Sequence, residues 1–267
     1  MHPRISINTL SFAPGSLGGQ IDTVARLGCR AVSPDLMQVE DHGVAETARH
    51  IADAGLEVAT LTHRAFGFAT PEEMAEARSR LERTIGIAGE IGAQTIIMTT
   101  GGRGALTWAE AADRFAEAIA PCIASAAAAG IRLGIEPTSH LYADASIVHR
   151  LADTVTVARQ AGITVIPDIF ACWVDADIEQ AIVEAGPSIS LIQISDYVYG
   201  DRGLPCRAVP GDGAIPFERL VPAFENAGFT GYYDLEIIGP RMQSEGQEQG
   251  LRRAADHIAA CIEGSSQ

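Results

Sequence analysis

Residues 129–137 read Ala-Gly-Ile-Arg-Leu-Gly-Ile-Glu-Pro, and this stretch contains the unit from which the fold can be inferred. Ala129-Gly130 is typical of a helix end, because glycine tolerates the left-handed conformation that stops a helix. The apolar run after this pair predicts a buried strand, and that strand ends at Glu136-Pro137. The chain therefore passes from helix to strand over a few residues and places a carboxylate where the strand ends.

The same transition recurs along the chain. Eight short apolar runs predict strands, and their starts lie 26 to 43 residues apart, which is the length of one βα unit. The predicted strands begin near Arg4, Arg30, Glu57, Gln94, Ile131, Ile163, Ile189 and Tyr232. Helix-ending glycines precede several of them, at Gly55, Gly92, Gly130, Gly162 and Gly228.

Helical periodicity fills the intervals between the predicted strands. Thr70 stands before Pro71, which is the arrangement of a capping residue followed by proline at the first helical position. Thr107 and Glu110 have the spacing of a capping box. The predicted helices include Pro71–Ile91, Thr107–Ala129, Ser146–Ala161 and Gln247–Ile262.

Regular alternation of strands and helices predicts an α/β protein with a parallel sheet. Eight strands favour a closed (β/α)8 TIM barrel, and the length of 267 residues suits one such unit. A doubly wound open sheet is the alternative, but no GxGxxG follows the first strand. No linker or low-complexity segment interrupts the pattern, so we predict a single TIM-barrel domain over residues 1–267.

The charge balance bears on the class of ligand. Lys and Arg total 19 against 34 Asp and Glu, which gives a formal net charge of −15. A field of this sign repels nucleic-acid phosphates and anionic membrane surfaces. We therefore expect neither nucleic acid nor membrane as a partner, and we expect a small uncharged or metal-bound substrate.

The predicted compartment is the cytoplasm. No apolar run approaches the ~20 residues of a membrane span, and Met1–Pro3 leads into a strand without the apolar core of a signal peptide. The five cysteines are scattered and form no CxxC pair, which favours reduced thiols.

Polar side chains stand at or near the carboxyl ends of the last four predicted strands. These are Glu136, Asp168, Gln193 and Glu236, each among apolar neighbours. Active residues of a barrel belong at this end, and a carboxylate among buried strands is costly unless it is paired or metal-bound. Each acid alone could instead be a helix cap or an exposed loop residue. Together the four predict a site for one divalent metal ion.

In their order and spacing, these residues carry a family resemblance that covers nearly the whole chain. The chain resembles the xylose isomerase-like TIM barrel superfamily of sugar isomerases, epimerases and related lyases. The motifs that carry the resemblance are Asn8-Thr-Leu-Ser-Phe12, Glu136-Pro137, Asp168 with Trp173, Arg207-x-x-Pro-Gly-x-Gly213 and Leu235-Glu236. The resemblance implies a homo-oligomer, because dimers and tetramers are usual in this superfamily.

Three positions depart from the usual patterns. Many members have His three residues after the sixth-strand Asp, where this chain has Ala171, and His on the seventh strand, where it has Gln193. Gln at that position resembles the 3-dehydroshikimate dehydratase branch. That branch usually has His two residues after the fifth-strand Glu, where this chain has Thr138. Neither the epimerase pattern nor the dehydratase pattern is complete.

The ligand set determines the chemistry we expect. Three carboxylates and one amide offer only oxygen, which suits Mn²⁺ or Mg²⁺ better than Zn²⁺. A metal that binds a substrate's carbonyl and adjacent hydroxyl stabilises an enediolate. By resemblance to the epimerases, Glu136 and Glu236 are the pair that removes and returns a proton.

Other side chains are candidates for substrate binding, and each has a plain structural alternative. They are His63 (or a capping or second-layer histidine), His140 (or an exposed loop histidine), Trp173 (or a packing residue) and Arg207 (or a surface arginine). Asp196 is expected either to orient a ligand or to cap its loop. Four further histidines are expected on helices or loops away from this face: His42, His50, His149 and His257.

The favoured function is a metal-dependent isomerase or epimerase of a polyhydroxylated keto-sugar or polyol-type substrate. The alternative is a lyase or dehydratase on a 3-dehydroshikimate-like or other cyclic ketone. Endonuclease IV shares the barrel, but its zinc site needs histidines where this chain has Ala171 and Gln193. A non-catalytic barrel that binds a partner is the remaining alternative.

Overall fold

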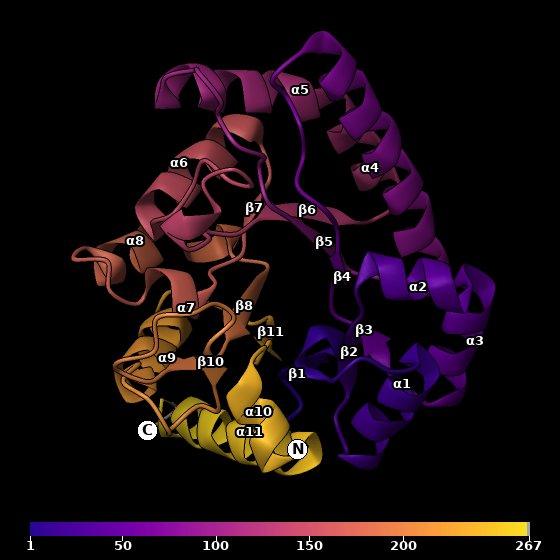
Figure 1. The fold of residues 1–267 in the computed structure, drawn as a ribbon, viewed down its shortest axis with the longest axis vertical. Coiled ribbons are helices and arrows are strands. Elements are labelled where there is room, and N and C mark those ends of the chain that lie inside the picture. The colour runs from indigo at the N-terminus through magenta and orange to yellow at the C-terminus, as the bar shows by residue number, and fades with distance from the viewer. Residues whose placement is uncertain (266–267) are drawn as a thin grey trace.

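A computed structural model describes residues 1–265. Parallel strands surround the centre of the molecule and helices surround the strands (Figure 1). All eight predicted strand positions are occupied, and the third position is interrupted and carries two labels. The barrel strands are β1 (Ile5–Asn8), β2 (Ala31–Ser33), β3 (Glu57–Val58) with β4 (Leu61–Thr62), β5 (Thr95–Met98), β6 (Arg132–Ile135), β7 (Thr164–Val165), β8 (Leu191–Ile194) and β11 (Tyr232–Leu235).

The ladder of hydrogen bonds around the ring has two seams. Regular parallel pairing gives the strand orders β3-β2-β1-β11-β8 and β4-β5-β6-β7. Only isolated parallel bridges join these two sheets. One seam has Val58–Ala93 and Asp35–Thr62, and the other has Val165–Ile189 and Asp168–Gln193. At the second seam Pro167 has no N–H to donate, although its carbonyl accepts from the Gln193 backbone at 2.9 Å.

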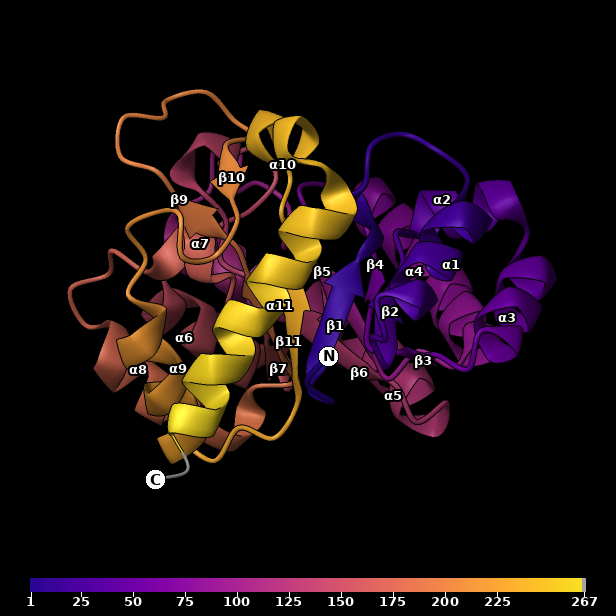
Figure 2. The same ribbon diagram turned by 90° about the horizontal axis from the view of Figure 1, so that it is seen from below.

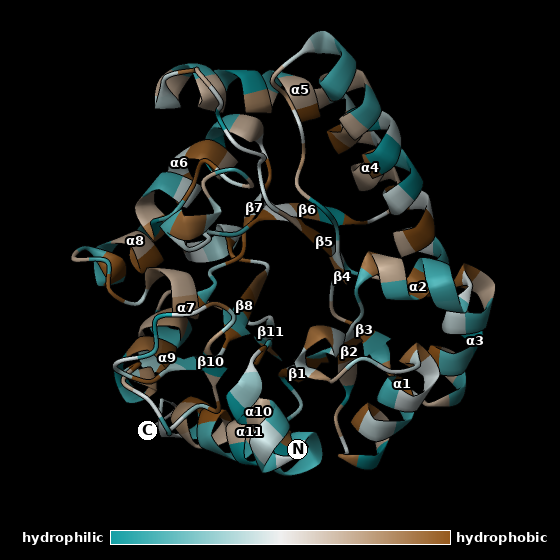
Figure 3. Ribbon diagram, viewed as in Figure 1, coloured by the Kyte–Doolittle hydropathy of each residue, from teal (hydrophilic) through white to brown (hydrophobic). Residues whose placement is uncertain are grey.

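Eleven α-helices are present in the described residues, and brown and teal segments alternate along several of them, as expected for amphipathic helices (Figure 3). Within residues 1–265, each helix is too short or too polar to cross a membrane. The helices are α1 (Leu17–Arg26), α2 (Leu36–His42), α3 (Val44–Asp53), α4 (Pro71–Ile91), α5 (Trp108–Ala128), α6 (Leu151–Ala161), α7 (Ile169–Cys172), α8 (Ile178–Ala185), α9 (Phe217–Asn226), α10 (Pro240–Glu245) and α11 (Gln247–Gly264).

The strands bury both of their faces, and neighbouring residues alternate between two apolar clusters. The large cluster joins one strand face to the helices and includes Val32 and Ile96. The small cluster contains residues of the strands or directly after them and fills the inside of the ring: Ala31, Ala59, Ile97, Ile166 and Leu191, with Tyr232 packed against them. The inside of the barrel is therefore a packed core below the level of the polar strand ends.

The predicted helix ends are confirmed where the sequence contains a recognisable capping residue. Thr70 caps α4 by accepting from the Glu73 backbone at 3.1 Å. Thr107 and Glu110 form the predicted capping box at the start of α5. Gly92 ends α4 in the left-handed conformation, with φ of 75°.

The predicted start of the helix before β7 is wrong. Helix α6 begins at Leu151, five residues after the predicted start at Ser146. The loop uses a backbone carbonyl that a helix would need, because the Val148 carbonyl accepts from the Thr138 N–H at 3.1 Å. The Ser146 hydroxyl accepts from the Val148 N–H at 3.2 Å. The helix starts only where the Asp175 carboxylate accepts from the Leu151 N–H at 2.8 Å.

Loops gather at the carboxyl ends of the strands. An antiparallel ribbon of β9 (Asp196–Tyr197) and β10 (Arg207–Ala208) lies there. Figure 2 shows β9, β10 and α10 at the end of the molecule toward which the β1 arrow points. Since active residues of parallel barrels lie at this end, the ribbon and its loops form the mouth of the candidate site.

Packing inside the ring predicts a large cost for Gly134→Ala. A Cβ at Gly134 would lie 2.6 Å from Ile166 Cδ1 and 2.8 Å from the Thr164 hydroxyl. We expect a loss of about 1–3 kcal/mol in the free energy of unfolding, measured by urea denaturation. Gly86→Ala on α4 is the matched control, because nothing lies within 4 Å of its added Cβ. The control is expected to gain up to about 1 kcal/mol, and equal losses in both variants would contradict the packing argument.

Candidate active site

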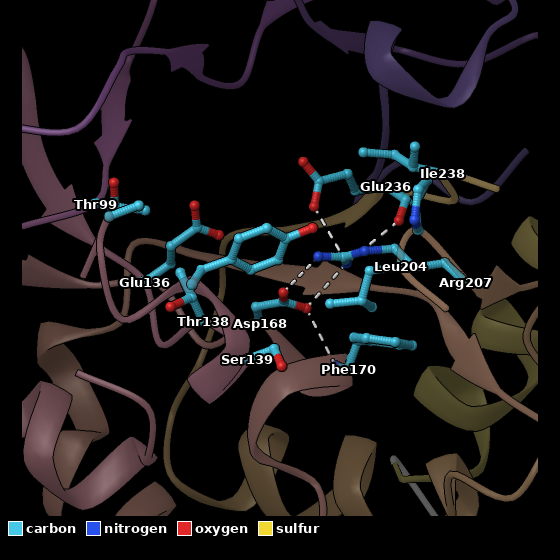
Figure 4. Close-up of a pocket in the computed structure, with 13 residues that line it drawn as sticks. Thr99, Glu136, Thr138, Ser139, Asp168, Phe170, Leu204, Arg207, Glu236 and Ile238 are labelled. Atoms are coloured by element: carbon cyan, nitrogen blue, oxygen red, sulfur yellow. Dashed lines mark hydrogen bonds and ion pairs between the residues drawn. The ribbon is translucent and has the colours of Figure 1, made fainter. Parts of the chain in front are cut away.

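Three acidic side chains converge at the mouth of the barrel. Glu136 follows β6, Asp168 follows β7 and Glu236 follows β11. Each offers a carboxylate oxygen, and these oxygens lie within 4.8 Å of one another. In Figure 4 Glu136 approaches from one side, while Asp168 and Glu236 are joined on the other side by the Arg207 side chain. Parallel strands that end at the same rim bring these distant residues together.

Arg207 on β10 holds two of the three carboxylates. Its guanidinium donates to Asp168 at 2.6 and 3.1 Å and lies 3.1 Å from a Glu236 carboxylate oxygen. The Ser195 hydroxyl accepts from it at 3.0 Å, and the guanidinium carbon lies 4.9 Å from the centre of the Phe170 ring. Because one cation faces three acids, the site keeps an excess of negative charge.

This excess charge and the burial of the site change the pKa values of the two glutamates. Burial raises the pKa of Glu236 to about 7, and the Arg207 guanidinium opposes that shift. Burial together with the charges of Glu236 and Asp168 raises the pKa of Glu136 well above its ordinary value. Burial opposes the charge on Arg207, but the Asp168 and Glu236 carboxylates prevail and raise its pKa. The arginine therefore stays charged while the glutamates compete for protons.

Gln193 on β8 completes the predicted set of four. Its backbone forms a parallel bridge with Asp168, and its side chain is buried. The amide oxygen has no hydrogen-bond partner in the described residues, although it is shielded from water. An unpartnered buried acceptor is costly, so this oxygen is available to a cation. The structure thus brings the four predicted ligands to adjacent strand ends, and their binding of a metal stays a prediction.

A cavity of about 290 Å³ opens over these groups. Glu136, Asp168, Arg207 and Glu236 form its polar floor. Hydroxyl groups and apolar side chains line the rest of it, from Thr99, Thr138, Ser139, Tyr142, Phe170, Leu204 and Ile238. The lining offers several donors and acceptors to a small polyhydroxylated molecule.

Asp196 holds the loop that follows the β9–β10 ribbon. Its carboxylate is fully buried and accepts from four backbone N–H groups at 2.8 to 3.0 Å. Two of these donors are Gly211 and Gly213, and a Cβ at Gly213 would lie 2.4 Å from the carboxylate. Of the two roles expected for Asp196, the structure shows the loop cap. Because Asp196 also pairs with Ala208, the same residue holds the ribbon that presents Arg207.

His63 lies outside the lining of the cavity. Its ring packs toward α4, where Nδ1 lies 3.0 Å from the Thr84 hydroxyl. Burial, with the nearby Arg80 and Arg64, lowers its pKa to about 4, so the ring is neutral near pH 7. The alternation of side chains along the strand turns His63 toward the helices, which agrees with the second-layer alternative rather than with substrate contact.

The other predicted substrate-binding residues occupy different places. Arg207 lines the cavity, whereas His140 is exposed and lies with the half-buried Trp173 along an adjoining groove. His149 was expected away from this face, and that expectation is wrong. Its Nδ1 lies 3.0 Å from the Thr138 carbonyl, and the ring lines the same groove. The loop between Glu136 and α6 folds back over the mouth, which its sequence spacing did not reveal.

Asp234 is a buried acid that the motif analysis did not single out. It accepts hydrogen bonds from the Ser6 hydroxyl at 2.5 Å, the Ser33 hydroxyl at 2.6 Å and the Asn8 amide at 3.1 Å. Burial raises its pKa and these hydrogen bonds oppose the shift. Its position two residues before Glu236, in the extended run of β11 and the residue after it, was the available signal, since alternate residues of an extended chain share a face.

A second cluster that could hold a metal lies outside the barrel. It consists of Glu218 on α9 with His257 and Cys261 on α11. The Glu218 side chain is 73% exposed, and burial raises the pKa of the Cys261 thiol to about 11. This cluster is separate from the cavity at the mouth.

The loop cap predicts a large loss of stability for Asp196→Ala. Four backbone N–H groups would lose a charged acceptor, and we expect a cost of about 3 kcal/mol or more in urea denaturation. Asp212→Ala is the matched control in the same loop, because Asp212 is an exposed partner of Arg253 at 2.7 Å. Its expected cost is below about 1 kcal/mol. Similar costs for both variants would overturn the role assigned to Asp196.

The raised pKa of Glu236 predicts how the metal-free protein responds to pH. Its folded-state pKa of about 7 lies above the ordinary value of 4.5, so its contribution is fully present below 4.5 and is lost as pH rises through 7. Between about pH 5 and about pH 8, we expect stability to fall by on the order of 3 kcal/mol from this group.

The measurement is urea unfolding in the presence of a chelator at both pH values. Glu236→Gln should lose the share of the fall that Glu236 contributes, because the amide does not titrate, while Glu136 keeps its own share. Glu248→Gln, at an exposed position on α11, is the control and should follow the wild type. An equal fall in all three proteins would refute the assignment to Glu236.

Comparison with known proteins places this geometry in a family. The model of a family described as xylose isomerase-like TIM barrel matches residues 21–261. Among curated proteins, no sequence matches this chain. A solved structure from Sinorhizobium meliloti 1021 is 26% identical with a TM-score of 0.88, and the match covers 97% of this chain and 98% of that one.

Two further solved structures show the same fold at lower identity. The IOLI protein with a bound zinc atom is 13% identical with a TM-score of 0.86, covering 98% of this chain and 99% of that one. D-Psicose 3-epimerase from Clostridium cellulolyticum H10 is 15% identical with a TM-score of 0.83, covering 97% and 99%. The predicted fold class is confirmed, and the chain belongs to the xylose isomerase-like TIM barrel family.

Proposed function

We propose that this protein is a divalent-metal-dependent isomerase or epimerase that acts on a keto-sugar or polyol-type substrate. The observation that carries the proposal is the convergence of Glu136, Asp168 and Glu236 on the floor of one cavity. The epimerase among the structural relatives supports the same class of reaction. A small polyhydroxylated molecule is the partner that fits the cavity.

The residues present fit a hard divalent cation. Three carboxylates face one arginine, so negative charge is left for a cation to neutralise. Within residues 1–265 the buried Gln193 amide oxygen lacks a hydrogen-bond partner, and we propose it as the fourth ligand. Because every donor is oxygen, we propose Mn²⁺ or Mg²⁺. When bound, the ion supplies Lewis-acid polarisation of the substrate's carbonyl and adjacent hydroxyl.

Glu136 and Glu236 are the proposed proton-transfer pair. Both carboxylates line the cavity at the barrel mouth. In the metal-free protein burial raises both of their pKa values, and a bound cation would oppose that shift. Arg207 lies 3.1 Å from Glu236, which makes Glu236 the better ionised of the two. Glu236 then removes the proton next to the carbonyl, and Glu136 returns one from its own carboxyl.

The remaining groups bind and orient the substrate. Thr99, Thr138 and Ser139 present hydroxyls to the cavity and can exchange hydrogen bonds with substrate hydroxyls. Arg207 is fixed by Asp168 through two hydrogen bonds, so it serves as a rigid donor at the floor. Rigid placement of these groups lowers the entropic cost of reaching the reactive geometry.

Metal binding gives the direct test of the site. Titration calorimetry with Mn²⁺ should find one ion per chain, and Glu236→Gln should lose most of the affinity because it removes a charged ligand. Affinity should also rise between about pH 6 and about pH 8, since the ion competes with protons on groups of raised pKa. Glu248→Gln is the control that should bind like the wild type. Equal binding by all three proteins, or no binding, would refute the metal site.

Solvent exchange tests the reaction itself. In D₂O with Mn²⁺, turnover of a panel of keto-sugars should place deuterium at the carbon next to the carbonyl, as read by NMR. Glu236→Gln should abolish the exchange, and Glu136→Gln should abolish formation of the isomerised product. A product that absorbs in the ultraviolet would instead identify elimination to a conjugated ketone, which is the lyase alternative. Absence of exchange across the panel would count against the isomerase proposal.

A further inference from the structure

A second cavity adjoins the carboxylate cavity at the mouth of the barrel. It measures about 570 Å³, and Ser139, Phe170 and Leu204 line both cavities. Its lining is mostly apolar, in contrast to the charged floor next to it. We call it the outer groove, and the side chains that give it this character are Leu141, Phe170, Trp173, Val174, Tyr197 and Leu204.

Aromatic rings run in a chain from the carboxylates along this groove. Phe170 lies against the Arg207 guanidinium, and its ring centre is 6.0 Å from that of Tyr197. The Trp173 ring lies 6.3 Å from Tyr197 and 6.3 Å from Tyr199. The Tyr197 hydroxyl donates to the Asp201 carbonyl at 2.8 Å, which fixes the middle of the chain.

The groove and its edges leave apolar surface open to water. In the part of the chain that the structure describes, seven large hydrophobic residues are exposed, and four of them stand around the mouth. Leu141 is 62% exposed, Val174 67% and Tyr199 75%, while Tyr142 lines the carboxylate cavity. A concentration of this kind beside a polar cavity marks a binding surface rather than scattered exposure.

The charges of the groove do not favour an anionic ligand. Its lining contains two arginines, Arg150 and Arg202, and two aspartates, Asp175 and Asp201. Arg150 is already held by the Asp177 carboxylate at 2.6 Å. Arg202 donates to the Tyr197 hydroxyl at 3.1 Å. The balance of charge and the apolar walls suit a neutral, flat group better than a phosphate.

We propose that the outer groove binds an aromatic substituent of the substrate, so that the substrate class is a keto-sugar glycoside with an aromatic aglycone. This inference rests on the proposed function, because the carboxylate cavity takes the sugar. The shared residues Ser139, Phe170 and Leu204 place the two cavities next to each other, and in this proposal one molecule reaches from one into the other. Stacking on Trp173 and Tyr197 would orient the aglycone and draw the sugar onto the carboxylates.

Ligand binding tests the groove without any turnover. The chain has two tryptophans, and Trp108→Phe leaves Trp173 as the single reporter in the Mn²⁺-loaded protein. Phenyl β-D-glucopyranoside and methyl β-D-glucopyranoside share the sugar and differ only in the aglycone. The phenyl glycoside should change the Trp173 emission and bind at least roughly tenfold more tightly than the methyl glycoside.

A charge in the groove should remove this preference. Val174→Asp is expected to bring the two affinities to within about twofold, while Val183→Asp, at an exposed position on α8, keeps the wild-type ratio. Equal affinities in the wild type, or no change in emission with either glycoside, would overturn the inference. A ligand-free dimer that Val174→Asp dissociates in sedimentation would also overturn it, because a second copy would then cover the groove.

The experiments distinguish failure of the proposed isomerase function from failure of the aromatic-aglycone proposal. Mn²⁺ titration and deuterium exchange with unsubstituted keto-sugars judge the carboxylate site, and neither measurement involves the aglycone. The ratio of phenyl to methyl affinity judges the groove alone. A working metal site with a ratio near one would reject the aromatic aglycone and leave the proposed function in place.

Discussion

The contact between Arg207 and the carboxylates of Asp168 and Glu236 is the interaction on which the mouth of this barrel depends. Three acids within 4.8 Å of one another repel, and their burial adds the cost of lost hydration. The bidentate pairing with Asp168 and the 3.1 Å contact to Glu236 offset part of that cost. The remaining negative charge is what makes the site suitable for a divalent cation.

The β9–β10 ribbon and the loop that follows it hold Arg207 in this position. The β9–β10 ribbon pairs Arg207 with Tyr197 and Ala208 with Asp196. Asp196 in turn accepts four backbone hydrogen bonds and leaves no room for a side chain at Gly213. Asp196, a buried carboxylate outside the lining of the carboxylate cavity, therefore helps to hold Arg207 beside Asp168 and Glu236. Polar floor and apolar groove meet at Phe170, which contacts the guanidinium on one side and the aromatic chain on the other.

Local chemistry explains which elements could be predicted. Apolar runs separated by one βα length gave the eight strand positions, and Thr70, Thr107 and Gly92 marked helix ends because capping is a local interaction. The start of α6 could not be predicted from the local sequence, because the Val148 carbonyl accepts from the Thr138 N–H and the Ile147 N–H donates to Thr100, and both partners lie outside this segment. His63 was assigned to the mouth by its position at a strand end, but the direction of its side chain turned it toward Thr84.

The sequence by itself determined the fold class and the strand ends on which Glu136, Asp168, Gln193 and Glu236 stand. It did so because strand periodicity, helix caps and the placing of one polar residue after an apolar run are all short-range features. Only the tertiary structure decided that Arg207 pairs with two of those acids, that His149 lies at the mouth and that an aromatic chain leads outward from Phe170. Those contacts join residues from separate loops, and loop conformation depends on long-range packing and hydrogen bonds that no short window of sequence contains.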